Sequence, residues 1–131
     1  MKKTFRVGQS NEIVSEGRIF DLHNNYDFSG ISMSPGGRVQ VSFLPSPDHG
    51  RDESPLALIF EGVDYIEMRL GLGKSSERDL EEVGYKSPSD RNDAWLLAEE
   101  YSTGLDHLFL RFSGEYFLRI HSESAFLSEE L

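Results

Sequence analysis

The segment Leu105–Ser122, which reads LDHLFLRFSGEYFLRIHS, decides the fold of this chain. Apolar side chains recur at every second position on both sides of Ser113–Glu115, at Leu108, Leu110 and Phe112 and then at Leu118 and Ile120. This alternation predicts two strands, and the Ser-Gly-Glu sequence between them predicts the turn of a β-hairpin. Because neighbouring strand residues point to opposite faces, such a hairpin buries one face and leaves the other free.

Other stretches repeat the pattern. A second hairpin is predicted over residues 31–43, with Pro35–Gly37 as its turn. Leu56–Phe60 is a continuous apolar run, typical of a strand covered on both faces, and alternation resumes over residues 66–70. Gly62 lies between these two stretches, and a glycine inside a strand pattern indicates a bulge.

Four stretches carry weaker signals. The chain up to Asp27 has few apolar residues and is predicted to be irregular, and prolines and a glycine predict an acidic loop over residues 45–54. Residues 76–83 start with a possible serine N-cap and are followed by Gly84, which predicts a short helix, with a polar loop as the alternative. Residues 94–101 fit a strand or a helix, and the turn-like sequence that follows favours the strand.

These elements predict a mainly β fold, an antiparallel sheet sandwich or half-barrel built from hairpins, with one or two short helices. A chain of 131 residues is long enough to bury a core without disulfides, so we expect one globular domain over residues 1–131.

Composition narrows the possible partners. Thirteen basic residues against 23 acidic ones give a net charge of −10, which argues against binding to nucleic acid or to an anionic membrane. We expect a basic protein partner instead, although acidic residues also serve solubility alone. There is no cysteine, no secretory signal after the basic start and no apolar run long enough for a membrane span, so we expect a cytoplasmic protein.

Two short motifs resemble catalytic sequences, but each lacks a glycine that the motif requires. Gly71–Ser75 ends like a phosphate-binding loop, but Met68 stands where the first glycine must leave room for phosphate. Gly30–Ser34 resembles a nucleophile elbow, but Ser34 replaces the glycine that the tight turn needs. We therefore expect no catalytic residue, no nucleotide and no cofactor.

The four histidines are single and scattered, at His23, His49, His107 and His121, without the spacing of a metal site. No metal is expected. His107 and His121 lie on the two arms of the main hairpin, which predicts an exposed pair of neighbours on its outer face. The paired carboxylates, such as Glu81–Glu82, do not converge, because adjacent strand residues face opposite sides.

Acidic residues interleaved with aromatic ones are the remaining signal. Tyrosine offers a large contact area, and nearby carboxylates attract lysine or arginine on a partner. Strand alternation, with aromatics inside and acids outside, is the competing explanation. The predicted binding residues are Glu61, Asp64, Tyr65, Glu99, Glu100, Tyr101, Glu115 and Tyr116.

Two short motifs carry a resemblance to a known class of proteins. Phe20–His23 places a histidine three residues after a phenylalanine, and Phe60–Val63 closes an apolar strand with Phe-Glu-Gly-Val. In this order, with a hairpin between them, they resemble small acidic bacterial immunity-type proteins of polymorphic toxin systems and related uncharacterised families, although Asn24 stands where such sequences often have aspartate. The resemblance covers about 50 of the 131 residues and implies a non-enzymatic protein that binds one cognate toxin.

We therefore expect a non-enzymatic protein-binding module, with an acidic, aromatic-containing face, that neutralises or regulates a basic partner. The alternative is a small-ligand-binding or enzymatic β-domain with a pocket at the barrel mouth, whose polar groups would be His23, His107 and His121. A homodimer that pairs through a sheet edge is a third possibility.

Overall fold

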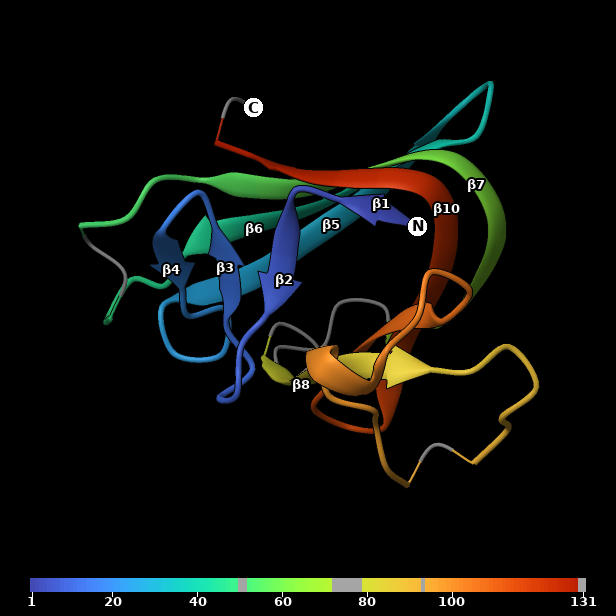
Figure 1. Cartoon of the computed structure of the whole chain (residues 1–131). Helices are drawn as coiled ribbons and strands as arrows, with labels where there is room; N and C mark the ends of the chain where they lie inside the picture. Colours follow the sequence, from blue (N-terminus) through green and yellow to red (C-terminus); the bar gives the residue numbers. More distant parts are fainter. Residues whose placement is uncertain (50–51, 72–78, 93, 130–131) are drawn as a thin grey trace.

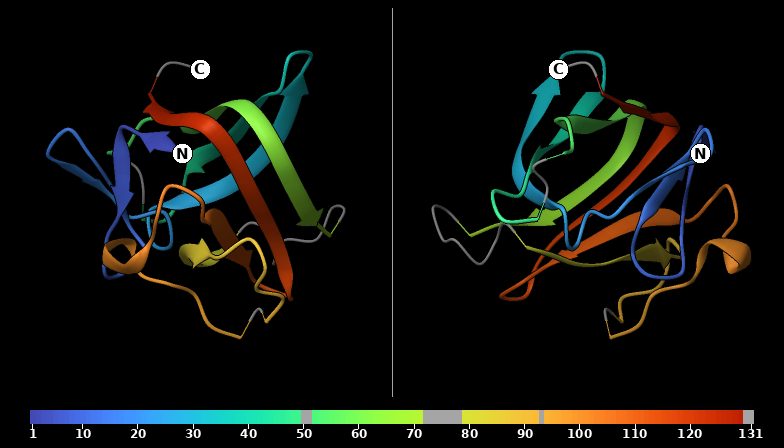
Figure 2. Two further views of the ribbon diagram at one scale, coloured as in Figure 1. Left: turned by 45° about the vertical axis from the view of Figure 1, so that its right-hand side comes forward. Right: turned by 90° about the vertical axis from the view of Figure 1, so that its left-hand side faces the viewer.

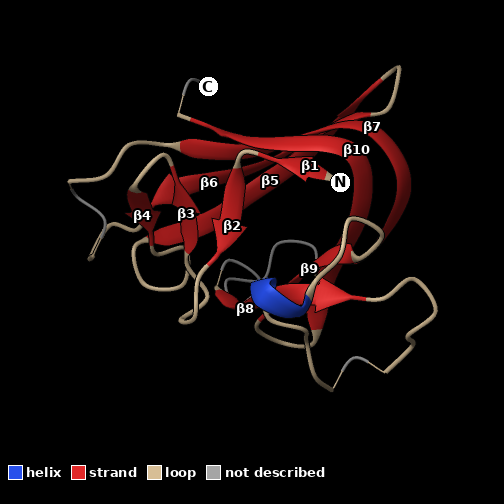
Figure 3. Cartoon of the chain, viewed as in Figure 1, coloured by secondary structure: helices blue, strands red, loops and turns tan. Residues whose placement is uncertain are grey.

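Two antiparallel sheets make up most of the computed structural model, which describes residues 1–49, 52–71, 79–92 and 94–129 (Figure 1, Figure 3). The strands are β1 (Lys2–Lys3), β2 (Phe5–Val7), β3 (Ile13–Ser15), β4 (Arg18–Phe20), β5 (Tyr26–Ser34), β6 (Arg38–Pro45), β7 (Leu56–Arg69), β8 (Leu80–Lys86), β9 (His107–Phe112) and β10 (Tyr116–Ser128), and η2 (Glu99–Tyr101) is a 3₁₀ turn. The larger sheet has the order β5-β6-β7-β10-β9-β8, and β1 pairs in parallel with β10 beside this path. The mainly β, antiparallel fold is therefore confirmed.

The two predicted hairpins are both present. In the β9–β10 hairpin Tyr116 pairs with Phe112 and Ile120 pairs with Leu108. Its turn contains two residues with positive φ, Gly114 at 85° and Glu115 at 67°. In the β5–β6 hairpin the alternating side chains of β6 enter the core, as the sequence pattern predicts. Val39, Val41 and Phe43 of this strand are at most 3% exposed.

The strands β7 and β10 run side by side and bend together, so that the large sheet curves into a half-barrel (Figure 2). The register between them shifts where His121 pairs with Tyr65 and Ser122 pairs with Val63, which leaves Asp64 as the extra residue of β7. Gly62, where a bulge is predicted, has φ 67° and lies two residues before this shift. Bulges increase local twist and bend, and this one lies in the curved part of the sheet. The half-barrel stays open, because β5 and β8 lie at opposite ends of the strand order.

The prediction of an irregular N-terminal segment is wrong, because residues up to Asp27 contain β1 to β4 and the start of β5. Each strand from β2 to β4 is three residues long, too short to show a clear alternation in the sequence. The turn Glu16–Gly17 joins β3 to β4 with φ 51° and 78°, as two-residue hairpin turns require. Ile13 and Phe20 of this small sheet join the core formed by the large sheet, so the small sheet covers its concave face.

Two further predictions need correction. Residues 80–83 belong to strand β8 and not to a helix, because Leu80 and Val83 are buried against the core, while residues 76–78 lie outside the described residues. Residues 94–101 do not form a strand. Leu97 makes one isolated bridge to Tyr85, and η2 follows, so this segment covers the edge of β8.

Candidate functional site

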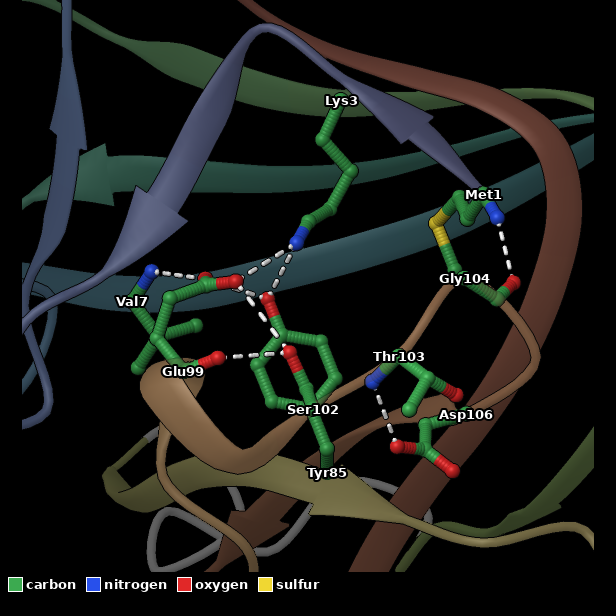
Figure 4. A network of polar contacts seen from close by, with 9 residues as sticks. All are labelled: Met1, Lys3, Val7, Tyr85, Glu99, Ser102, Thr103, Gly104 and Asp106. Carbon is green, nitrogen blue, oxygen red and sulfur yellow. Dashed lines mark hydrogen bonds and ion pairs between the residues drawn. The ribbon is translucent and has the colours of Figure 1, made fainter.

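A partly buried polar network centred on Glu99 joins the N-terminal strands to η2 (Figure 4). Glu99 Oε1 accepts hydrogen bonds from the backbone N–H of Val7, at 2.7 Å, and from the Tyr85 hydroxyl, at 2.6 Å. Lys3 Nζ lies 3.0 Å from Glu99 Oε2 and 2.6 Å from the Tyr85 oxygen. Ser102 Oγ closes the turn by donating to the backbone carbonyl of Glu99 at 2.7 Å.

The electrostatics of this network favour the charged form of Glu99. Burial alone would raise the pKa of Glu99, but the hydrogen bonds from Tyr85 and Val7 and the contact with Lys3 outweigh it, so the pKa lies below its ordinary value. Burial, followed by the neighbouring Glu99 carboxylate, raises the pKa of Tyr85. Glu99 is therefore an internal anion that fixes the position of η2.

The turn that follows η2 is held by two hydrogen bonds, one within the turn and one to the N-terminus (Figure 4). The backbone N–H of Thr103 donates to Asp106 Oδ2 at 2.8 Å, and the Gly104 carbonyl accepts from the Met1 ammonium at 2.5 Å. Two large apolar side chains are exposed on this fixed segment. Tyr101 is 70% exposed and Leu105 is 74% exposed.

His121 links the same turn to the bulge of β7. Its Nδ1 lies 2.7 Å from Asp64 Oδ1, and its Nε2 lies 3.0 Å from the carbonyl oxygen of Gly104. Both ring nitrogens therefore face oxygen acceptors. The hydrogen bond with His121 holds the pKa of Asp64 below its usual value, and the side chain of Asp64 is still 67% exposed. Asp64 thus adds an exposed carboxylate beside the turn that carries Tyr101 and Leu105.

The predicted pairing of His107 with His121 is confirmed, because their ring centroids lie 5.7 Å apart. The prediction that both are exposed is wrong: His107 is only 6% exposed and stacks on Tyr65 at 4.4 Å, and the side chain of His121 is 16% exposed. Arg119 Nε donates to His107 Nδ1 at 2.9 Å, which requires an unprotonated Nδ1. Burial, followed by the charge of Arg119, lowers the pKa of His107 to about 4. His107 is therefore a neutral structural residue.

The burial of His107 is not evident from its own strand, because Tyr65 of β7 and Arg119 of β10 cover the ring. The segment that follows β8 in turn covers Arg119. Arg119 is 1% exposed and donates to the backbone carbonyls of Ser87 and Asp90, each at 2.8 Å. Lys86 is fully buried, with its ammonium 3.5 Å from an Asp90 carboxylate oxygen and 4.1 Å from the centre of the Trp95 ring. Two buried cations therefore hold this segment over the outer face of the sheet.

A cavity lies on the outer face near the turn of the β9–β10 hairpin. Its volume is about 330 Å³, and it is lined by Arg69, Phe109, Arg111, Glu115, Tyr116 and Phe117. The rings of Phe109 and Phe117 stack in parallel, 5.3 Å apart. The cavity therefore combines aromatic surface with charged groups, and it is built on the hairpin's outer face.

The predicted binding residues fall into separate groups. Asp64 and Tyr65 lie at the bulge, while Glu100 and Tyr101 lie on η2, and the contacts of His121 with Asp64 and Gly104 bring these two segments together. Glu61 pairs with Arg38 at 3.2 Å on the other side of the bulge. The last group lines the cavity and consists of Glu115 and Tyr116. The remaining predicted residue, Glu99, is engaged in the internal network.

The two segments that resemble catalytic motifs in sequence have the following places in the structure. Gly30–Ser34 lies within strand β5, and residues 72–75 of the glycine-rich segment lie outside the described residues. In the part of the chain that the structure describes, no three His, Asp or Glu side chains are grouped so as to hold a metal ion. Among the same residues no helix has the length and apolar character needed to cross a membrane.

Comparisons with protein-family models, with curated proteins and with solved structures find no match to this chain. The geometry of the molecular surface therefore carries the functional conclusion.

Proposed function

We propose that the chain is a non-enzymatic protein-binding module whose basic partner docks on η2 and the turn that follows it. The docking face, called here the Tyr101–Leu105 face, consists of Asp64, Glu100, Tyr101 and Leu105. The observation that carries the proposal is that Tyr101 and Leu105, two large apolar side chains, are 70% and 74% exposed on a segment whose backbone is fixed by hydrogen bonds.

Fixed exposed apolar groups are suited to binding, because a partner covers them without having to order the segment first. The Glu99 network and the Met1 and His121 contacts with Gly104 supply this rigidity. Without a partner, such groups leave apolar surface in contact with water.

Charge selects the kind of partner. Asp64 and Glu100 are exposed, and the whole chain carries a net charge of −10. Glu100 precedes Tyr101 in η2, and His121 links Asp64 to Gly104. A basic protein is therefore attracted from a distance and oriented during encounter. The finer proposal, which rests on the resemblance to immunity-type proteins, is a cytoplasmic protein that neutralises one basic toxin.

Charge reversal tests the proposal after the partner has been captured from lysate at low salt, identified and purified. The Asp64→Lys/Glu100→Lys double variant is expected to slow association on the order of tenfold, because it removes the attracting charge at the face. Surface plasmon resonance measures this rate, and association of the unmodified chain is expected to slow as salt is raised.

The matched control is the Asp48→Lys/Asp52→Lys double variant, which makes the same charge change on two exposed residues of the loop after β6. It also tests whether this proline-containing loop is the binding element. If both variants slow association equally, the effect arises from net charge and not from the face. If the loop variant slows association more, the partner binds the loop. Either result contradicts the proposed face.

A second candidate function, binding of a small ligand, is favoured by one observation, the cavity of about 330 Å³ at the hairpin turn. Its volume is at the lower end of the range for small-molecule sites.

A further inference from the structure

We propose that the cavity between Arg69 and Arg111 binds a small carboxylate that is carried on an aromatic ring. The proposal is independent of the Tyr101–Leu105 face. It starts from the strand register, in which Phe117 of β10 pairs with Arg69 of β7 on one side and with Arg111 of β9 on the other. Directly paired residues point to the same face of a sheet, so the side chains of Arg69 and Arg111 lie on the face of Phe117, one on each side of it.

The two arginines provide the charge for an anion. Arg69 is exposed at the last position of β7. Arg111 is positioned more firmly, because its guanidinium lies 3.4 Å from Glu82 and 5.4 Å from the centre of the Phe109 ring. Guanidinium groups bind carboxylates through paired, charge-assisted hydrogen bonds. In a chain with a net charge of −10, both arginines line the same small cavity.

The aromatic residues select the remainder of the ligand. Phe109 is 1% exposed, and its ring stacks on that of Phe117 with an angle of 8° between the two planes. Tyr116 also contributes to the lining. A planar ligand that contacts these rings gains stacking and apolar burial while its carboxylate reaches the arginines. Glu115, the acid among the described residues that line the cavity, disfavours ligands that carry more than one negative charge.

The fixed position of the rings supports a cavity that exists before the ligand arrives. A Cβ atom placed on Gly71 would lie 2.5 Å from the Tyr116 ring, so that only glycine lets this ring pack against the backbone at the end of β7. Phe109 and Arg111 are held within β9, between β10 and β8. A ligand therefore meets a wall whose aromatic side chains are already positioned.

Three small probes separate charge from ring: benzoate has both, benzamide has the ring without the charge, and acetate has the charge without the ring. Each is titrated to millimolar concentration into the full ¹⁵N-labelled chain, and amide and arginine side-chain shifts are followed by NMR. Benzoate is expected to shift the signals of Phe117, Tyr116 and Arg111 in a saturable manner. Acetate and benzamide are expected to bind at least about tenfold more weakly, because each lacks half of the recognised chemistry.

Variants assign the effect to the cavity. Arg69→Gln and Arg111→Gln are each expected to weaken benzoate binding by about tenfold or more, whereas Arg38→Gln, an exposed arginine of β6, is expected to leave it unchanged. The spectrum of each variant verifies that it is folded. The proposal is overturned if benzamide shifts the same signals equally, if neither cavity variant weakens benzoate, or if benzoate produces no saturable shift.

Discussion

At His107 the fold keeps an ionisable ring neutral by burying it and by directing Arg119 toward it. The ring is covered by Tyr65, and its Nδ1 accepts a hydrogen bond from the guanidinium, so a proton on that nitrogen would remove this contact and bring two positive charges together. His121 has different neighbours, because both of its ring nitrogens face oxygen atoms. Two neighbouring histidines thus have different roles, and the difference arises from contacts made by other strands.

This arrangement predicts a pH dependence of stability. The pKa of His107 lies at about 4 in the folded chain and near 6.5 when unfolded. As pH falls from about 6.5 toward 4, the unfolded chain takes up a proton that the folded chain excludes, so folding stability decreases. We expect His107 to contribute a loss of about 2 kcal/mol between pH 7 and pH 4.5.

His107→Gln is the test, because glutamine keeps an oxygen acceptor for Arg119 and does not titrate. Urea unfolding at the two pH values gives the free energy of unfolding of each protein. The variant is expected to lose about 2 kcal/mol less than the unmodified chain over this interval. If both lose the same free energy, protonation of His107 does not destabilise the fold.

At the scale of elements, Glu99 ties the first strands of the chain to the segment that carries the Tyr101–Leu105 face. Replacing Glu99 by glutamine keeps the size of the side chain but leaves the partly buried Lys3 ammonium without its counter-ion. We expect a loss of about 2–3 kcal/mol in the free energy of unfolding. Faster hydrogen exchange at the amide of Val7, which donates to Glu99, is the local signature.

The neighbouring residue provides the control. Glu100 is exposed on the same 3₁₀ turn, so Glu100→Gln is expected to change the free energy of unfolding by less than about 0.5 kcal/mol. Equal stability of the Glu99→Gln and Glu100→Gln variants, measured by chemical unfolding, would show that the network does not hold η2 in place.

The sequence predicts long strands better than short ones, because a short strand has too few residues to show an alternating pattern. The arms of the β9–β10 hairpin alternate for five or more residues and are predicted correctly, whereas the strands β2 to β4 have three residues each and give no period. Residues 80–83 carry a helix-like local signal, whereas their strand structure and burial depend on pairing with β9.

The same limit applies to the site. Local hairpin register is sufficient to predict that His107 and His121 are neighbours. The contact between His121 and Asp64 depends on the long-range pairing of β10 with β7 and on the register shift at the bulge, which no local pattern shows. The cover over Arg119 comes from carbonyls after β8, and backbone acceptors leave no trace in the sequence.

At the scale of the whole molecule, the half-barrel carries two separate candidate binding features. Near the bulge, the Tyr101–Leu105 face combines exposed apolar groups with carboxylates. Near the β9–β10 turn, the cavity combines two arginines with aromatic rings. The core on the concave side holds the strands that present both, so each feature can be altered by surface substitutions that spare the core.

The most direct measurement is the dissociation constant of the purified partner for the Tyr101→Ala/Leu105→Ala double variant, determined by isothermal titration calorimetry. Removing both exposed groups is expected to weaken binding by about 2 kcal/mol or more, roughly thirtyfold, because large apolar groups at a fixed interface centre contribute most to affinity. Ile19→Ala, which removes a side chain that is 67% exposed on β4, is expected to bind like the unmodified chain. A double variant that binds as tightly as Ile19→Ala would contradict the account, because the partner would then not use the Tyr101–Leu105 face.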